Sequence, residues 1–117
     1  MPAAVAITGM GAVTPLGDAA GTWRALLAGE SATVAAPERL RAAGCQVVAA
    51  VSGFDPSAHM DRYAARHMGR FSQLAVAACR LAVADAGLGE GAGLGEGAGL
   101  VVHTGAGGLI EAEAAAL

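Results

Sequence analysis

Lysine is absent from this chain of 117 residues, and all seven of its basic residues are arginines. Without lysine the chain lacks the motif of P-loop nucleotide-binding proteins. The net charge of −3 provides no overall positive field for nucleic acid. No uncharged apolar run approaches the roughly 18 residues of a membrane span. The opening MPAAVAIT also lacks the basic and apolar regions of a secretory signal.

Aromatic residues are scarce as well, at 3% of the sequence, although hydrophobic residues make up 55%. Alanine, valine and leucine must therefore form most of any core. The two cysteines, Cys45 and Cys79, match neither a metal-binding nor a disulfide spacing. The sequence therefore predicts a cytoplasmic protein with reduced thiols and no metal site. Cys79 lies within an apolar segment, and we expect it to be an unreactive core thiol.

Glycine, in contrast, is abundant, with eighteen residues that divide the chain into short elements. The hydrophobic pattern predicts strands over 4–8, 46–51 and 100–104, and helices over 19–28, 62–86 and 110–117. Gly29 and Gly87 are expected to end the first two of these helices. Residues 30–45 are expected to be irregular or weakly helical. This alternation of strands and helices is typical of the α/β class.

The segment 88–99 is a doubled LGEGAG unit, which predicts a flexible surface loop. The helical pattern of 110–117 stops without a glycine cap, so we expect the fold to be incomplete at the C-terminus. The long helix over 62–86 has only a narrow polar stripe. We therefore expect that helix to be mostly buried within a larger structure.

Gly9 and Gly11 follow the first predicted strand and match the start of a dinucleotide-binding fingerprint. The complete pattern requires a third glycine where this chain has Thr14, and Pro15 removes an amide donor from the loop. A small nucleotide-binding domain is therefore the least favoured hypothesis. We expect the two glycines to let the strand leave a sheet tightly, before a turn and a helix capped by Asp18.

Three segments, in order, resemble the β-ketoacyl-acyl-carrier-protein synthases, the elongating type of condensing enzyme. These segments are VAITGMGAVTPLGD with TWRALLAGES, FDPS with DRYAARHMGRFSQLAVAACRLAVADAGL, and GLVVHTGAGGL. The resemblance implies that residues 1–117 are the amino-terminal part of a thiolase-like layered α/β/α/β/α fold. It also implies an acyltransferase of fatty acid or polyketide biosynthesis, which extends acyl chains by decarboxylative Claisen condensation with a malonyl-carrier protein.

The same resemblance implies that the nucleophilic cysteine and the catalytic histidines lie beyond residue 117. No catalytic residue is thus expected within this chain, and the fragment alone is expected to be inactive. No cofactor is implied, because the acyl groups are carried on the phosphopantetheine of acyl carrier protein. The full-length protein is expected to be a homodimer. The alternative is a non-catalytic chain-length partner subunit in a heterodimer with an active synthase.

Two groups of site residues follow from the resemblance. The loop formed by Gly105, Ala106, Gly107 and Gly108 matches a segment that borders the acyl pocket, where glycine allows close backbone approach. The other interpretation of this loop is a turn between a strand and a helix. The second group is a carrier-protein patch formed by Arg62, Arg66 and His67. Its alternative is a solvent-exposed helix face.

Overall fold

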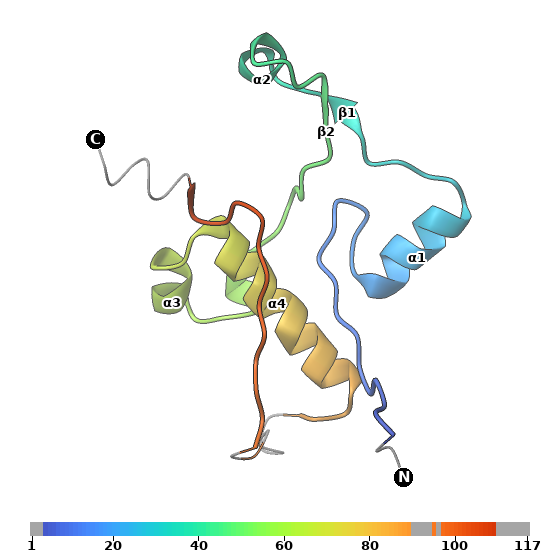
Figure 1. The fold of residues 1–117 in the computed structure, drawn as a ribbon, viewed down its shortest axis with the longest axis vertical. Coiled ribbons are helices and arrows are strands. Elements are labelled where there is room, and N and C mark those ends of the chain that lie inside the picture. The colour runs from blue at the N-terminus through green and yellow to red at the C-terminus, as the bar shows by residue number, and fades with distance from the viewer. Residues whose placement is uncertain (1–3, 90–94, 96, 110–117) are drawn as a thin grey trace. The chain divides into compact units, whose positions relative to one another are not determined.

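The computed structural model describes residues 4–89, 95 and 97–109 (Figure 1). The chain divides into two compact units, Ala12–Phe54 and the combination of Met1–Gly11 with Asp55–Leu117. Each unit is a small arrangement of helices and irregular segments, and the strands described lie in the first. The elements in chain order are α1 (Ala19–Leu27), β1 (Val34–Ala35), α2 (Glu38–Ala42), β2 (Val47–Val48), the 3₁₀ helix η1 (Pro56–Ala58), α3 (Arg62–Arg66) and α4 (Arg70–Asp85).

The unit Ala12–Phe54 begins with the predicted turn, in which Thr14 and Gly17 exchange two backbone hydrogen bonds of 2.9 and 3.1 Å. Asp18 then caps α1, because its Oδ1 accepts a hydrogen bond of 2.7 Å from the Gly21 N–H. The helix stops before Gly29, whose φ of +72° suits glycine. The predicted helix over 19–28, its cap and its stop are confirmed.

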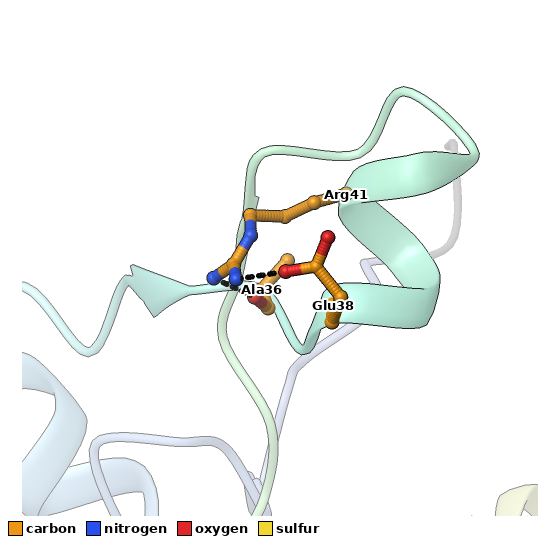
Figure 2. Close-up of polar contacts among 3 residues, drawn as sticks. All are labelled: Ala36, Glu38 and Arg41. Carbon is orange, nitrogen blue, oxygen red and sulfur yellow. Dashed lines mark hydrogen bonds and ion pairs between the residues drawn. The ribbon is translucent and has the colours of Figure 1, made fainter.

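The rest of this unit is a short antiparallel ribbon with α2 between its strands. Val34 pairs with Val48, and Ala35 pairs with Val47. Figure 2 shows that Arg41 connects α2 to the residue that follows β1. Its Nη1 donates to the Ala36 carbonyl at 2.9 Å, and its guanidinium forms an ion pair with Glu38. The strand predicted over 46–51 is therefore shorter than expected, and the region predicted to be irregular contains its partner.

In the other unit the single helix predicted over 62–86 is divided into α3 and α4. The division falls at Gly69, which precedes α4 with an extended backbone (φ −61°, ψ 155°). Gln73 bridges the gap, because its Nε2 donates to the carbonyls of Ala65 and Met68 at 2.8 and 3.3 Å. The Ala65 carbonyl also accepts a long hydrogen bond of 3.4 Å from the Met68 N–H, so Gln73 adds to the hydrogen bonding at the end of α3. One side chain thus ties the two helices together.

The end of α4 confirms the predicted glycine stop. Gly87 has a φ of +71°, its N–H donates to the Ala84 carbonyl, and the next N–H, of Leu88, donates to the Val83 carbonyl, both at 3.0 Å. This pair of hydrogen bonds is the Schellman motif, which satisfies carbonyls at a helix end.

The strands predicted over 4–8 and 100–104 are wrong, since neither segment forms a strand. A strand requires a neighbour for its N–H and C=O groups, and the described residues supply none to either segment. Val5 and Ile7 are instead 94% and 85% exposed.

Gly9 and Gly11 consequently have a different role from the one expected. A Cβ added at Gly9 would lie 2.3 Å from the Ala82 carbonyl oxygen, and one at Gly11 would lie 2.1 Å from that of Ala78. Met10, between them, donates its N–H to Asp85 Oδ2 at 2.9 Å. The glycines allow the N-terminal segment to lie directly against α4, rather than to leave a sheet (Figure 1).

The core of the described residues is small. Its buried hydrophobic members are Ala25, Ala36, Met60, Ala65 and Ala77. On α4 only Ala77 is buried, so the expected burial of that helix is not achieved within the part of the chain that the structure describes. None of the helices described is long and apolar enough to cross a membrane. The predicted helix over 110–117 and half of the repeat, at 90–94 and 96, lie outside the described residues.

Candidate functional site

The predicted carrier-protein patch is built on α3. Asp61 begins this helix, because its Oδ1 accepts hydrogen bonds from the N–H groups of Tyr63 and Ala64 at 2.9 and 3.0 Å. Arg62 and Arg66 are exposed and four residues apart, a spacing that places them on the same face of a helix. The structure therefore brings the two predicted arginines together on an open surface.

His67 adjoins this pair at the end of α3 and is also exposed. Its ring lies 4.5 Å from that of Tyr63, measured between centroids, with the planes tilted by 57°. Tyr63 and His67 directly follow Arg62 and Arg66 in the sequence, so the ring pair adjoins the arginine pair on α3. Tyr63 was not predicted as part of the patch, although its spacing of four residues from His67 is the signal for this contact.

A carboxylate also acts on the patch. Hydrogen bonds from the Ser57 hydroxyl and then from the Ser57 N–H hold the pKa of Asp55 below its ordinary value of 3.8, against a small opposing effect of desolvation. The positive charges of Arg62 and His59 lower that pKa further. Asp55 is thus near enough to Arg62 for the two charges to interact.

The Asp55 carboxyl is expected to titrate below 3.8 in the folded chain. The Ser57 hydroxyl lies 2.8 Å from each carboxylate oxygen and favours the charged form. The resulting contribution to stability is present above the unfolded pKa and is lost as the pH falls through the lower folded pKa. In an NMR titration Ser57→Ala should raise the Asp55 pKa, while Ser52→Ala should leave it unchanged. An unaltered Asp55 pKa in Ser57→Ala would contradict this explanation.

The second predicted group, Gly105, Ala106, Gly107 and Gly108, forms a turn that is held by Thr104. The Thr104 Oγ1 accepts a hydrogen bond of 2.9 Å from the Gly107 N–H. A Cβ added at Gly107 would lie only 2.5 Å from Phe71 Cδ2, so the loop backbone contacts the ring closely. This contact of Phe71 with the loop was not predicted from the sequence. The loop's role beside an acyl pocket stays a prediction.

An apolar groove of about 740 Å³ runs along α4 in the same unit. It is lined by residues of α4 between Phe71 and Ala84, by Ala58 and His59, and by Leu100 and Val102 from the segment that follows the repeat. The predicted pocket loop 105–108 does not line it, but Phe71 contacts both. The groove is therefore a separate feature of this unit.

The two cysteines do not form a catalytic site in the described residues. Cys79 lines the groove and is exposed, so the prediction of a core thiol is wrong. The reason is that the described part of the chain does not cover this face of α4. Cys45 is exposed as well, and its Sγ donates weakly to the Val47 carbonyl at 3.3 Å. Across the residues that are described, no group of three His, Cys, Asp or Glu side chains is placed to hold a metal ion.

Comparison with known proteins identifies the family. A family model for the β-ketoacyl synthase N-terminal domain matches residues 3–116. The 3-oxoacyl-[acyl-carrier-protein] synthase 2 of Synechocystis sp. is 33% identical over 108 residues, and that of Coxiella burnetii is 36% identical over 108 residues. A Streptomyces halstedii protein, whose name assigns it to the polyketide β-ketoacyl synthases, is 38% identical over 115 residues.

These alignments cover 90% of this chain for the first two relatives and 93% for the third, but only 26% of each relative. The chain therefore spans about a quarter of the length of the proteins it matches. The resemblance found in the three sequence segments is confirmed by the family match, which covers almost every residue. The chain belongs to the β-ketoacyl synthase family and corresponds to its N-terminal domain.

Proposed function

We propose that this chain is the amino-terminal part of a 3-oxoacyl-carrier-protein synthase that elongates acyl chains in fatty acid or polyketide biosynthesis. The observation that carries the proposal is the family match over residues 3–116. The names of the relatives supply the reaction class, since they include a 3-oxoacyl-[acyl-carrier-protein] synthase and a polyketide β-ketoacyl synthase. Residues 1–117 would then form part of a thiolase-like layered fold in a cytoplasmic homodimer.

The proposed reaction has two steps. A cysteine thiolate attacks an acyl thioester, forming an acyl-enzyme and releasing the carrier thiol. A malonyl-carrier thioester then loses carbon dioxide, and the resulting carbanion attacks the acyl-enzyme carbonyl. The new carbon–carbon bond forms as the cysteine leaves as thiolate. We propose that the nucleophilic cysteine lies beyond residue 117, and that this chain does not supply it.

The part of the reaction assigned to this chain is binding. Exposed arginines on α3 suit the acidic side chains and the phosphate of a carrier protein, because guanidinium groups form paired hydrogen bonds with both. Gly105, Ala106, Gly107 and Gly108 are proposed to border the acyl pocket, where the absence of bulky side chains leaves room for the substrate.

A longer protein that contains these residues is expected to release carbon dioxide from malonyl-carrier protein and to form a 3-oxoacyl product. The measurement is a condensation assay with acyl- and malonyl-carrier protein, analysed by mass spectrometry. A longer protein that binds the carrier but forms no product would instead support the non-catalytic partner subunit. Failure of both binding and condensation would refute the proposal.

Arg66→Glu in that longer protein is expected to weaken carrier-protein binding by about 3- to 10-fold at low salt, with a smaller effect at high salt. Titration calorimetry at two salt concentrations measures the change. Arg39→Glu is the matched control, since Arg39 is an exposed arginine on α2, in the other unit. Equal carrier-protein affinities for the two variants at low salt would show that Arg66 on α3 does not contribute to carrier binding.

A further inference from the structure

Tyr63 is the most exposed of the four aromatic residues in the chain. It is 76% exposed, compared with 62% for Trp23 and 38% for Phe71, while Phe54 is only partly exposed. The ring of Phe71 packs against the backbone of Gly107, whereas the described residues leave Tyr63 open to solvent. Tyrosine is enriched in the surfaces that proteins use to bind one another, so its exposure on α3 indicates a contact for a partner.

The Tyr63 ring is already ordered by its contact with His67. The ring centroids are 4.5 Å apart and the planes are tilted by 57°. Aromatic pairs in such tilted arrangements stabilise each other beyond the area that they bury. The backbone beneath the pair is fixed as well, since Asp61 caps the start of α3 and the His67 N–H donates to the Ala64 carbonyl at 3.1 Å. A side chain that is ordered in advance loses less conformational freedom on binding.

Positive charge surrounds this ring pair. Arg62 and Arg66 directly precede Tyr63 and His67 in the sequence, and both arginines are exposed. Arg66 forms no ion pair with a described residue, so its guanidinium is available to an acidic partner. Tyrosine and arginine are also two of the residue types that dominate the binding energy of protein interfaces. The combination fits a protein surface on which carboxylates surround an apolar side chain.

We propose that Tyr63 anchors the carrier protein, that His67 orients the Tyr63 ring, and that the arginines of α3 mainly attract the acidic partner. This inference rests on the proposed function, which takes the carrier protein as partner from the names of the relatives. Burial of the ring is not screened by sodium chloride, whereas the attraction between exposed guanidinium and carboxylate groups weakens as salt rises. Salt therefore separates the contribution of the ring from that of the arginines.

The experiment measures carrier-protein binding to a longer protein that contains residues 1–117, by titration calorimetry at low and at high sodium chloride. Tyr63→Ala is expected to weaken binding by about 5- to 30-fold at both salt concentrations. Tyr63→Phe keeps the ring and should bind within about twofold of the natural protein. An effect of Tyr63→Ala that disappears at high salt would overturn the proposal. Tyr63→Phe that binds as weakly as Tyr63→Ala would also overturn it, by assigning the effect to the hydroxyl.

The positioning role of His67 has its own readout. His67→Ala should weaken carrier binding by about 2- to 10-fold, because the Tyr63 ring regains rotational freedom. His67→Phe should restore the affinity, since it keeps a ring beside Tyr63 without the imidazole. In the Tyr63→Ala background, His67→Ala should add less than about a twofold loss. Independent, multiplicative effects of the two alanine changes would show that His67 does not act through Tyr63.

Trp23→Ala is the matched control, because Trp23 is an exposed aromatic residue on α1, in the other unit. Its carrier affinity should stay within about twofold of the natural protein, since the proposed contact surface lies on α3. Equal losses of affinity in Trp23→Ala and Tyr63→Ala would overturn the proposal, by showing that removal of any exposed ring weakens binding.

The outcome is separable from that of the proposed function. Formation of the 3-oxoacyl product with unaltered carrier affinity in Tyr63→Ala would support the enzymatic assignment and refute the anchor. A salt-resistant loss of binding in Tyr63→Ala, in a protein that binds the carrier but forms no product, would support the anchor and the non-catalytic partner subunit. Absence of carrier binding and of product in the natural protein would refute both proposals.

Discussion

Gly11→Ala is expected to accelerate hydrogen exchange at the Met10 amide by about 5- to 150-fold, equivalent to about 1–3 kcal/mol of overpacking. The added Cβ would lie 2.1 Å from the Ala78 carbonyl oxygen and 2.5 Å from the Ala82 nitrogen. Both are backbone atoms in the middle of α4, so they cannot move aside as a flexible side chain would. The N-terminal segment must retreat, and the hydrogen bond from Met10 to Asp85 lengthens or breaks.

Gly89→Ala is the matched control for this experiment. An added Cβ at Gly89 meets nothing within 4 Å, and the backbone there is not in the left-handed region. Exchange at Met10 should therefore be unchanged in Gly89→Ala. If Gly11→Ala exchanged as slowly as this control, the close approach of residues 9–11 to α4 would be disproved.

Gly107→Ala is expected to destabilise the unit that contains α4 by about 1–3 kcal/mol through a collision with an aromatic ring. The added Cβ would lie 2.5 Å from Phe71 Cδ2 and 2.6 Å from Thr104 Oγ1, the atom that accepts the Gly107 hydrogen bond. The collision should therefore disturb both the ring packing and the turn. The free energy of unfolding, measured by chemical denaturation, reports the change.

A double-mutant cycle identifies the cause of this loss. Phe71→Ala removes the ring, so adding Gly107→Ala to that variant should cost at least about 0.5 kcal/mol less than adding it to the natural chain. Gly105→Ala is the control in the same loop, since its Cβ meets nothing within 4 Å. Additive effects of the Phe71 and Gly107 changes would mean that the ring does not determine the need for glycine.

Features that depend on a few neighbouring residues were predictable from the sequence. The cap at Asp18, the stops at Gly29 and Gly87 and the extent of α1 match the structure closely. Each is decided by hydrogen bonds within about one helical turn, so local residue types are sufficient. The division of the helix at Gly69 had a local signal too, since glycine within a helix costs about 1 kcal/mol relative to alanine.

The strands were less predictable, because a strand exists only when another segment pairs with it. Residues 4–8 and 100–104 carry the right apolar residues, but no described segment pairs with them. Residues 47–48 do pair, with 34–35, although the latter have no stronger strand pattern. For the candidate site, the arginines of α3 could be predicted, whereas the contact of Phe71 with Gly107 depends on segments far apart in the chain.

The sequence by itself determined the family, the extent of α1, the end of α4 and the placement of Arg62, Arg66 and His67 on one short exposed stretch. Membership follows from the order of residues along the chain, and caps and stops follow from local hydrogen bonding. Only the tertiary structure decided that Gly9 and Gly11 serve a close approach to α4 and that Cys79 lies in an open groove. Those outcomes depend on which backbone atoms and side chains from distant parts of the chain fill the surrounding space. A local sequence pattern does not specify these neighbours.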